Sequence, residues 1–350
     1  MTTETGRAGE AAPGVLEEAI RRYWPDYAGT PEAGAKGWNN TTRFAEHDGK
    51  RYVLRVYETH READRILFEH EVLLKLAEAE LPYRTPVPLR ESGGAGQTLV
   101  RLEDGSGRYA CLFAYIEGMR PADEDTRPMR AFGAAAGRLS RALAAIRPER
   151  APAYRPYYEL GEAYPLCGPE RVRAFCAEPP AALAGVRAQL GLLAEAHAEI
   201  LRELDHLRDL PHQLVHGDLN ASNLLVDAES PERLVALLDF EFCTRDARAM
   251  DLAVILSGLP DDEQAVAAFL EGVAAELRFD AEELEAIPLL MRLRKVDVFL
   301  HFLTRYLEGT DGPDVLEEQA RSLAEDLVRM RDSEPCRVRS LNALRSDVLR

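Results

Sequence analysis

The sequence changes character near residue 118, and this change constrains the fold more than any other feature. Before it, apolar and β-branched residues come in short runs of strand type, and residues 41–58 form two such runs around an Asp-Gly pair suited to a tight turn. After it, long Ala- and Leu-rich patterns of helical spacing dominate. We therefore expect an α+β chain with a β-rich N-terminal lobe over residues 1–117 and a larger, mainly helical C-terminal lobe over residues 118–350.

The N-terminal lobe is expected to contain four strands and one main helix, in the order strand, strand, helix, strand, strand. Apolar residues recur at helical spacing over residues 62–80, and prolines follow them. The last two strands are expected at residues 97–102 and 108–116, and a short amphipathic helix at residues 14–24 precedes the hairpin. Residues 1–13 are expected to be disordered.

The C-terminal lobe is expected to be helical around two short apolar strands. Helical patterns cover residues 126–147, 181–209 and 247–332, the last with breaks near Pro260, Asp280 and Gly312, and the strands are expected at residues 224–226 and 233–240. His197 and His206 have no partner at metal-ligand spacing, and we expect both to be surface residues.

Composition argues against several classes of protein. A net charge of −17 leaves nothing to neutralise a phosphate backbone, which argues against a nucleic-acid binder. No run approaches the roughly 18 apolar residues that a membrane span needs, and the N-terminus lacks the pattern of a secretory signal. The five cysteines are scattered without a CxxC pair, which favours thiols in a reducing cytosol over disulfides or zinc. We expect a cytoplasmic protein, as a monomer or homodimer.

A short polar loop within the helical lobe carries the strongest functional signal. Residues 214–225 read LVHGDLNASNLL, with His216, Asp218 and Asn223 directly before an apolar run. Asp and Asn also favour ordinary turns, so the loop alone is compatible with a polar turn that leads into a strand. A second carboxylate, Asp239, ends the next apolar run in the sequence LDFEF. The two features together make a functional site the better interpretation.

These residue types match the needs of phosphoryl transfer to a hydroxyl group. The reaction requires a carboxylate that orients the hydroxyl and accepts its proton, and hard oxygen ligands that hold Mg²⁺ against the triphosphate. Asp218 and Asn223 supply a carboxylate and an oxygen ligand from one loop, and Asp239 supplies a second carboxylate from the next strand. The pattern therefore predicts a magnesium site.

The sequence resembles the aminoglycoside phosphotransferase and choline kinase group, whose members have a bilobal protein-kinase-like fold. The group's motif H-G-D-x-x-x-x-N appears as HGDLNASN at residues 216–223, and its D-F-E or D-F-G motif appears as DFE at residues 239–241. The resemblance implies that Asp218 is the catalytic base, that Asn223 and Asp239 bind Mg²⁺, and that ATP is the phosphate donor.

Within this group, the N-terminal hairpin looks most like that of the class that includes bacterial homoserine kinases. A similar Asn-Thr pair before the first hairpin and a similar V-L-x-x-Y-E pattern after it appear here in GWNNTTRF and YVLRVYE. The resemblance implies a kinase that acts on a hydroxyl of a small molecule, such as homoserine or another amino alcohol. An aminoglycoside-type antibiotic phosphotransferase and a nucleotide-binding pseudokinase without turnover remain as alternatives. A protein kinase is disfavoured, because residues 239–251 leave no room for a long activation loop.

Residues 34–42 occupy the position of the loop that covers the phosphates in such kinases. They lack the GxGxxG pattern of protein kinases, and backbone N–H groups with the hydroxyls of Thr41 and Thr42 could hold phosphate instead. Gly37 and Asn40 belong to the same candidate nucleotide-binding segment. A solvated loop that leads into a strand is the alternative.

Arg55, in YVLRVY, occupies the position of the strand lysine that binds the α- and β-phosphates in kinases. The substitution keeps the charge but replaces a compact ammonium by a planar fork. An arginine on an exposed strand face is the alternative. The resemblance places its carboxylate partner at Glu69, with Glu71 as the second choice.

Further roles also come from the resemblance. Phe113, Ala114 and Tyr115 would form the hinge whose backbone groups bind adenine, although an ordinary core strand explains the same residues. His216 would brace the backbone near the DFE aspartate, and Asp251 would tie down the catalytic loop from the start of a helix.

Two acidic segments, residues 123–125 and 261–263, are candidates for binding a cationic acceptor. Charge runs of this kind also form ordinary solvated surfaces. No motif in the sequence identifies the acceptor.

Overall fold

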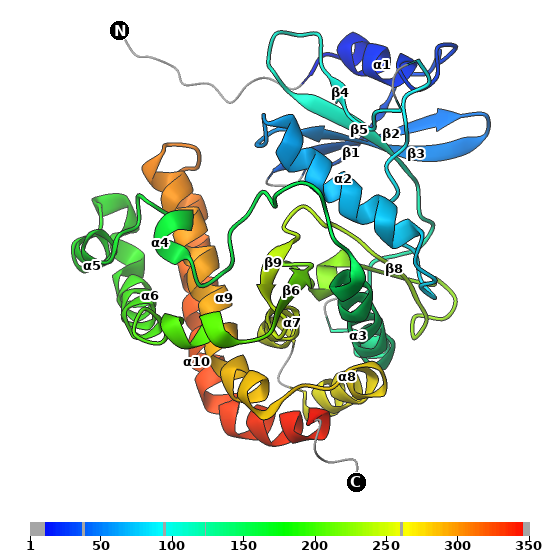
Figure 1. Cartoon of the computed structure of the whole chain (residues 1–350). Helices are drawn as coiled ribbons and strands as arrows, with labels where there is room; N and C mark the ends of the chain where they lie inside the picture. The colour runs from blue at the N-terminus through cyan, green and yellow to red at the C-terminus, as the bar shows by residue number, and fades with distance from the viewer. Residues whose placement is uncertain (1–10, 37–38, 94–95, 123, 260–261, 346–350) are drawn as a thin grey trace, which may run out of the picture. The chain divides into compact units, whose positions relative to one another are not determined.

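The computed structural model describes residues 11–36, 39–93, 96–122, 124–259 and 262–345, and the chain divides into two compact units (Figure 1). Unit 1 comprises residues 1–118, 146–153 and 235–241, and unit 2 comprises residues 119–145, 154–234 and 242–350. Two segments of unit 1 therefore come from the part of the sequence that is otherwise helical.

Unit 1 contains a five-stranded antiparallel sheet and two helices. In sheet order the strands are β1 (Glu32–Lys36), β2 (Asn40–His47), β3 (Lys50–Tyr57), β5 (Tyr109–Ala114) and β4 (Val100–Arg101), and the helices are α1 (Pro13–Arg21) and α2 (Ala63–Ala77). This sheet, together with the mostly helical second unit, confirms the predicted α+β class.

The strands β2 and β3 form the hairpin that the sequence predicts. His47 pairs with Lys50, so Asp48 and Gly49 are the two residues of the turn. Both have left-handed φ angles, of 50° and 68°. A two-residue turn with two positive φ angles matches the right-handed twist of the strands, and it fixes the register of the whole hairpin.

The expected loop over residues 34–42 is wrong at both ends, because residues 34–36 belong to β1 and residues 40–42 belong to β2. The strand sequence EAGAK has no β-branched or aromatic residue, so local propensity gives no strand signal. Gly34 permits the pairing, since a Cβ there would lie 2.9 Å from the backbone oxygen of Thr42. Gly37, a predicted nucleotide-binding residue, lies outside the described residues.

Alternation along β3 directs its side chains to opposite faces of the sheet. Leu54 and Val56 are buried in an apolar core that includes Ile20 of α1. Arg55 lies between them in sequence and therefore points to the other face, where its guanidinium contacts Glu69 of α2. One face of β3 is thus apolar, and the other carries a charged pair.

The chain returns to unit 1 at residues 235–241, after the start of the strand β8 (Leu234–Leu237). The backbone of Arg84 binds this segment in both directions: its N–H donates to Val235 O at 2.8 Å, and its carbonyl accepts from Leu237 N at 3.1 Å. These bonds hold the following DFE sequence in unit 1.

Unit 2 is mainly helical (Figure 1). Its helices are α3 (Met129–Ala145), α4 (Leu160–Ala163), α5 (Pro169–Ala177), η1 (Ala181–Val186), α6 (Arg187–Ile200), η2 (Leu204–Asp209), η3 (Ala221–Asn223), α7 (Met250–Gly258), α8 (Glu263–Glu276), α9 (Ala281–Leu307), α10 (Pro313–Leu341) and η4 (Asn342–Leu344). Its short strands are β6 (His212–Val215), β7 (Leu224–Val226) and β9 (Thr244–Ala247), and β6 pairs with β9. Among the described residues, no helix is long and apolar enough to span a membrane.

The three breaks expected in the C-terminal helical region are confirmed. They separate α7, α8, α9 and α10 near Pro260, Asp280 and Gly312. Asp280 begins α9 with a capping box. Its side chain accepts from the backbone N–H of Glu283, and the Glu283 side chain accepts from the backbone N–H of Asp280. The sequence does not predict β6 and β9, because strands of four residues are too short to show a period.

The helical pattern over residues 181–209 is confirmed, and it is divided into three helical elements. The structure has α6 flanked by the 3₁₀ turns η1 and η2, and Val186 leaves the helical region with φ −118° and ψ 17°. His197 was expected at the surface but is only 3% exposed, because α5, α9 and α10 pack around α6. His206, on η2, is exposed as expected.

Candidate active site

The polar loop of unit 2 is fixed to the helix that follows it in sequence. Asp251, in the first turn of α7, accepts hydrogen bonds from the backbone N–H groups of His216 at 2.8 Å and Gly217 at 2.9 Å. Burial raises the pKa of Asp251, and the hydrogen bonds and charge of its loop partners act in the opposite direction. The backbone before Asp218 is therefore held at two consecutive positions.

Gly217 allows the loop to turn sharply between His216 and Asp218. Its φ is 82°, a value that L side chains rarely adopt, and a Cβ would lie 2.4 Å from the backbone oxygen of Phe242. Tyr157 donates from its hydroxyl to the carbonyl of Gly217 at 2.5 Å. The turn is thus closed on one side by backbone and on another by an aromatic hydroxyl.

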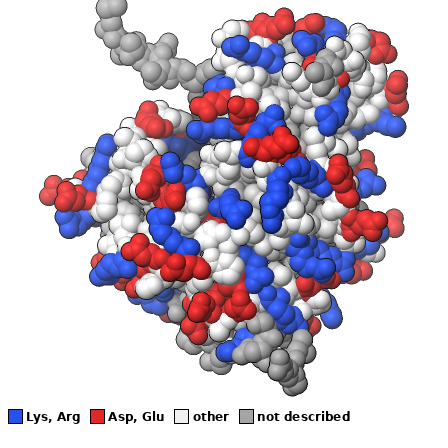
Figure 2. All heavy atoms as spheres, viewed as in Figure 1, with Lys and Arg blue, Asp and Glu red and all other residues white. Residues whose placement is uncertain are grey.

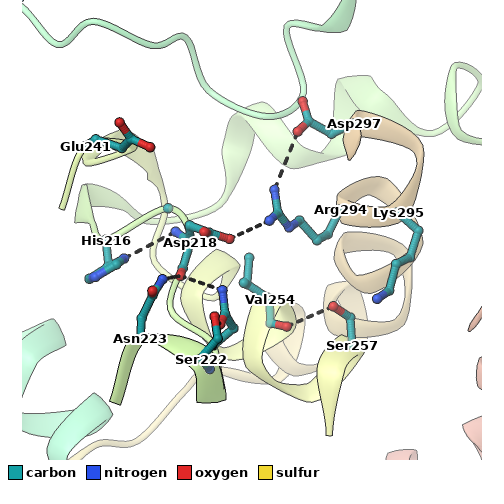
Figure 3. A network of polar contacts seen from close by, with 12 residues as sticks. His216, Asp218, Ser222, Asn223, Glu241, Val254, Ser257, Arg294, Lys295 and Asp297 are labelled. Carbon is teal, nitrogen blue, oxygen red and sulfur yellow. Dashed lines mark hydrogen bonds and ion pairs between the residues drawn. The ribbon is translucent and has the colours of Figure 1, made fainter. Parts of the chain in front are cut away.

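Asp218 is oriented by contacts of its own loop (Figure 3). Its backbone N–H donates to His216 Nδ1 at 3.3 Å. Its carbonyl accepts from the side-chain amides of Asn220 at 3.1 Å and Asn223 at 2.9 Å. Because the amide nitrogen of Asn223 is engaged, its oxygen is the atom suited to a cation.

The carboxylate of Asp218 is paired with Arg294 of α9, a residue that the sequence does not single out (Figure 3). Arg294 Nη2 donates to Asp218 Oδ1, and Nη1 donates to the hydroxyl of Tyr157 at 3.0 Å. Burial alone would lower the pKa of Arg294, but Tyr157, Asp218 and Asp297 together raise it. Arg294 is therefore a permanent cation beside the candidate base.

Asp297 lies one helical turn after Arg294. Its Oδ1 accepts from the hydroxyl of Tyr164 at 2.8 Å, and its Oδ2 lies 3.7 Å from Arg294 Nη1. Burial raises the pKa of Asp297 to about 6, although Arg294 and the hydrogen bond from Tyr164 lower it. A cation and an anion thus lie on the same face of α9.

The sequence does contain a signal for this pair. Apolar residues of α9 recur at Leu290, Leu293, Val296 and Leu300, all of them buried. Arg294 follows Leu290 by four residues, and Asp297 follows Leu293 by four, so both charges interrupt the apolar stripe. Charged residues within a buried stripe need partners, and this makes them candidates for a site.

In unit 1, Arg55 connects two acidic residues. Its Nη1 donates to Glu69 Oε1 at 2.9 Å, and its Nη2 lies 3.4 Å from Asp239 Oδ1. Burial alone would lower the pKa of Arg55, but Glu69 and Asp239 raise it. Glu71, the second choice as partner, instead accepts from Lys75 at 3.0 Å and from the backbone of Glu149 at 2.7 Å.

Asp239 has two properties expected of a residue that binds a metal ion. Its φ is 67°, in the left-handed region, where a residue with a side chain is held only by its surroundings. Its Oδ1 is buried and accepts no hydrogen bond in the described part of the chain, apart from the ion pair with Arg55. A hard carboxylate oxygen in this state fits Mg²⁺.

Glu241, two residues later, anchors the segment before β3. It accepts from the amide of Asn39 at 3.2 Å and from that of Asn40 at 2.6 Å. Burial and the neighbouring Asp239 raise the pKa of Glu241 to about 8. Through these hydrogen bonds, Glu241 joins residues 39–40 to the DFE sequence. Asn40 Oδ1 is, like Asp239 Oδ1, a buried oxygen without a hydrogen bond among the described residues.

The other predicted nucleotide-binding residues have internal contacts. The hydroxyl of Thr41 donates to Glu58 at 3.0 Å, and Thr42 pairs with Arg55 across the hairpin. In the predicted hinge, Phe113 lies under the guanidinium of Arg55, 5.3 Å from its Cζ. Their roles toward a nucleotide stay predictions.

The backbone N–H groups that the hinge prediction relies on are engaged within unit 1. Ala114 N donates to Val87 O, and Tyr115 N donates to Arg51 O, each at 3.3 Å. The ring of Tyr115 contacts the Arg51 guanidinium, whose Cζ lies 4.8 Å from the ring centre. Recognition of adenine by these N–H groups would therefore require exchange of two long hydrogen bonds.

The two acidic segments lie partly outside the described residues, at Asp123 and Asp261. In the described parts, Asp125 accepts from the backbone and side chain of Arg127. Asp262 caps α8 by accepting from the backbone of Gln264 and Ala265. Both carboxylates are thus used in local structure.

The predicted metal ligands are distributed over the two units, with Asn223 in unit 2 and Asp239 in unit 1. Within the described residues, no group of three or more His, Cys, Asp and Glu side chains could by itself hold a metal ion. The carboxylate and amide oxygens present are nevertheless the ligand type that Mg²⁺ takes.

The fold and the two sets of polar residues define a class of protein. In one unit, Arg55 of a five-stranded antiparallel sheet pairs with Glu69 of α2 beside the DFE aspartate, and a mainly helical unit carries the HGDxxxxN loop. This is the construction of phosphotransferases with a protein-kinase-like fold.

The chain belongs to the APH family, described as a phosphotransferase enzyme family, whose model matches residues 31–287. It is similar to the homoserine kinase of Rhizobium meliloti (strain 1021), with 29% identity over 294 residues, covering 81% of this chain and 82% of that protein. The predicted family and the prediction of a small-molecule kinase are confirmed by these findings.

Solved structures confirm the fold. A microcompartment-associated aminopropanol kinase has a TM-score of 0.70 at 18% identity, covering 95% of this chain and 99% of that chain. The GDP complex of an aminoglycoside 2′-phosphotransferase-IIIa has a TM-score of 0.63 at 16% identity, covering 91% and 99%. The bilobal protein-kinase-like fold expected from the sequence is therefore correct.

Proposed function

We propose that this protein is an ATP- and Mg²⁺-dependent kinase that phosphorylates a hydroxyl group of a small molecule, with homoserine or another amino alcohol as the acceptor. The observation that carries the proposal is the loop around Asp218, whose backbone is fixed by Asp251 and whose next polar residue, Asn223, is oriented by the loop itself. The family match and the similarity to a homoserine kinase support the chemistry and the acceptor.

Asp218 takes the role of catalytic base. It would orient the acceptor hydroxyl and accept its proton as the hydroxyl oxygen bonds to phosphorus. The backbone N–H groups of His216 and Gly217 donate hydrogen bonds to Asp251, so the backbone that leads to the Asp218 carboxylate is fixed. Its present partner, Arg294, is displaced or shared when the acceptor binds.

The nucleotide is assigned to unit 1. Arg55, held by Glu69, would contact the phosphates in place of the kinase lysine. Asp239 and Asn223 are the residues that would hold Mg²⁺, and bound Mg²⁺ neutralises phosphate charge. The buried Oδ1 of Asp239, which has no hydrogen bond among the described residues and only the ion pair with Arg55, supports this assignment.

The remaining assignments toward the nucleotide rest on the resemblance alone. They concern Gly37, Asn40, Thr41, Thr42, Phe113 and Tyr115. A cytoplasmic location and a monomeric or homodimeric state likewise stay predictions.

Two alternatives have less support. An aminoglycoside acceptor carries several ammonium groups and calls for an acidic pocket, whereas Asp125 and Asp262 are used in local structure and a cation, Arg294, lies beside Asp218. A pseudokinase is disfavoured because Asp218, Asn223 and Asp239 are all present. Turnover by the purified protein would separate the proposal from both alternatives.

The test is phosphorylation of an acceptor panel with ATP and Mg²⁺, comparing the wild type with Asp218→Asn. We expect phosphorylation of homoserine or a related amino alcohol, and a loss on the order of 10²–10⁴-fold in kcat for Asp218→Asn, the usual share of a positioned base. The change keeps the size of the side chain, so nucleotide affinity measured by calorimetry should stay at the wild-type level.

Two results would contradict the proposal. One is a D218N variant with full kcat and normal nucleotide affinity, which would remove Asp218 from the chemistry. The other is phosphorylation of aminoglycosides alone, which would keep the kinase and replace its acceptor.

A further inference from the structure

Arg294 and Asp297 form a pair of opposite charges on one face of α9, next to Asp218 (Figure 3). Their side chains are 20% and 15% exposed, so they are sheltered but still reachable from solvent. Lys295, between them in sequence, points away and binds Asp326 of α10 at 2.7 Å. The cation that faces the candidate base is therefore Arg294.

The pair is not a closed salt bridge. The nearest atoms, Arg294 Nη1 and Asp297 Oδ2, are 3.7 Å apart, beyond hydrogen-bond distance. Each side chain is instead positioned by a tyrosine: Tyr157 accepts from Arg294 at 3.0 Å, and Tyr164 donates to Asp297 at 2.8 Å. Both charges are thus oriented, and neither is neutralised by direct hydrogen bonds to the other.

Such a pair matches a ligand that carries both charges itself. A guanidinium presents five N–H donors in a planar fork that fits a carboxylate, and a carboxylate binds an ammonium group. An α-amino acid bears its carboxylate and its ammonium group on the same carbon, so the two charges lie close together. Arg294 and Asp297 are one helical turn apart and therefore neighbours, and their nearest charged atoms are 3.7 Å apart. Because Arg294 contacts Asp218 directly, one small molecule is long enough to reach both the charge pair and the candidate base.

Resting on the kinase function proposed above, we propose that the acceptor is a hydroxy amino acid, and that Arg294 binds its carboxylate while Asp297 binds its ammonium group. The hydroxyl on the side chain of this amino acid then lies at Asp218. The two residues of α9 determine specificity, and Asp218 performs the proton transfer.

This arrangement selects against the neighbouring classes of acceptor. An amino alcohol without a carboxylate leaves Arg294 without its ligand and places an ammonium group near a guanidinium. An aminoglycoside adds further ammonium groups, which Arg294 repels. A hydroxy acid without the amine leaves the Asp297 carboxylate unmatched beside another carboxylate, which is also unfavourable.

The test uses acceptors that differ by one charged group. Homoserine is compared with 3-aminopropan-1-ol, which lacks its carboxylate, and with 4-hydroxybutanoate, which lacks its ammonium group; serine, ethanolamine and 3-hydroxypropanoate form a second set. We expect kcat/KM for one amino acid to exceed both of its analogues by roughly 10- to 100-fold, the usual effect of one hydrogen-bonded charge.

Variants then assign each charge to a residue. Arg294→Gln should raise KM for the amino acid and collapse its advantage over the analogue without a carboxylate, with Arg294→Lys intermediate. Asp297→Asn should remove the preference in kcat/KM for the amino acid over the analogue that lacks the ammonium group. Arg292→Gln is the matched control, because Arg292 lies two residues before Arg294 on α9 and lines a cavity of about 710 Å³ with Glu199 and His206, whose lining includes neither Arg294 nor Asp297.

The outcomes separate this inference from the function on which it rests. Turnover of 3-aminopropan-1-ol or ethanolamine as efficient as that of the amino acid would overturn the inference and leave the kinase standing. An equal fall in kcat for all acceptors in R294Q, with KM unchanged, would also overturn it and make Arg294 a positioning residue for Asp218. Absence of phosphorylation with every acceptor would instead refute the proposed function.

Discussion

Asp239, the proposed metal ligand, shows at the scale of one residue how the fold can orient a carboxylate. A residue with a side chain costs on the order of 1–3 kcal/mol in the left-handed region, and such strain persists only where the surroundings impose it. Here the preceding strand is bonded to Arg84, and the carboxylate faces Arg55. The backbone therefore aims one buried oxygen that has no hydrogen bond among the described residues.

The first prediction at this scale concerns the charge of Asp239. Asp239→Asn keeps the size of the side chain but removes the anionic oxygen that Mg²⁺ prefers. We expect the variant to lose the Mg²⁺-dependent part of its nucleotide affinity, measured by calorimetry with and without the metal. Glu46→Gln, an exposed position on β2, is the matched control. Unchanged affinity for Mg²⁺-nucleotide in D239N would exclude Asp239 as a ligand.

The sequence predicts the residues that lie within motifs and misses those that reach the site from a distant helix. Asp218, Asn223 and Asp239 are recognisable because their spacing is local. Arg294 reaches Asp218 across 76 positions of the chain, and its only local signal is the interruption of an apolar stripe. The resemblance ranks Glu69 before Glu71 as the partner of Arg55, and the contact between Arg55 and Glu69 agrees with that order.

At the scale of elements, two glycines allow α3 and α8 to pack closely. A Cβ on Gly133 would lie 1.9 Å from the backbone oxygen of Phe269, and a Cβ on Gly272 would lie 2.1 Å from that of Arg130. Each helix thus places a glycine where the backbone of the other approaches. The contact cannot hold a methyl group without moving one helix.

This close contact gives a prediction for stability. Gly133→Ala should destabilise unit 2 by about 1–3 kcal/mol or more, the usual cost of overpacking, despite the better helix propensity of alanine. Gly191→Ala, on α6, is the control, because nothing lies within 4 Å of its added Cβ. It should be neutral or stabilise by up to roughly 1 kcal/mol. Urea unfolding of both variants checks this, and equal stability of the two would contradict the packing argument.

Element boundaries are predicted well where the chain supplies strong local signals. Asp280 marks the start of α9 by a capping box, and Asp48-Gly49 marks the hairpin. The strand β1 is missed because EAGAK has low strand propensity and forms only by pairing with β2. The helical pattern over residues 181–209 does not indicate where η1, α6 and η2 begin and end.

At the scale of the whole molecule, the excess of acidic residues is not gathered in one place on the face shown. Figure 2 shows acidic and basic side chains interspersed over it. Some of the acidic residues are instead buried. Burial raises the pKa of Glu241 in unit 1 to about 8 and that of Asp246 in unit 2 to about 7.

These buried carboxyls predict how stability depends on pH. Below about pH 4, each of these two carboxyl groups is protonated in the folded and in the unfolded chain, and the free energy of unfolding does not change with pH on its account. Between that pH and the raised pKa, the unfolded chain has released the proton and the folded chain has kept it. The free energy of unfolding should therefore fall as the pH rises from about 5 to about 8.

Urea unfolding at several pH values measures this effect, and Asp246→Asn isolates one group. The asparagine cannot ionise, so the decline between pH 5 and pH 8 should be shallower than in the wild type. Asp205→Asn, which removes an exposed carboxylate on η2, should leave the decline as it is. The same slope in D246N and the wild type would show that Asp246 does not hold a proton in the folded chain.

The arginine on β3 also determines how this protein responds to covalent reagents. An amine can lose its proton and attack an acyl group, whereas a guanidinium keeps its proton at any pH used for proteins. If Arg55 contacts the nucleotide phosphates as proposed, a nucleotide that carries an acylating group would therefore find no nucleophile at this position, where a kinase lysine would react. Only four of the 43 cationic residues of the chain are lysines, and none of them lies on β3 beyond its first residue, so a lysine-directed reagent would leave the position of Arg55 unlabelled even when the protein is folded and active.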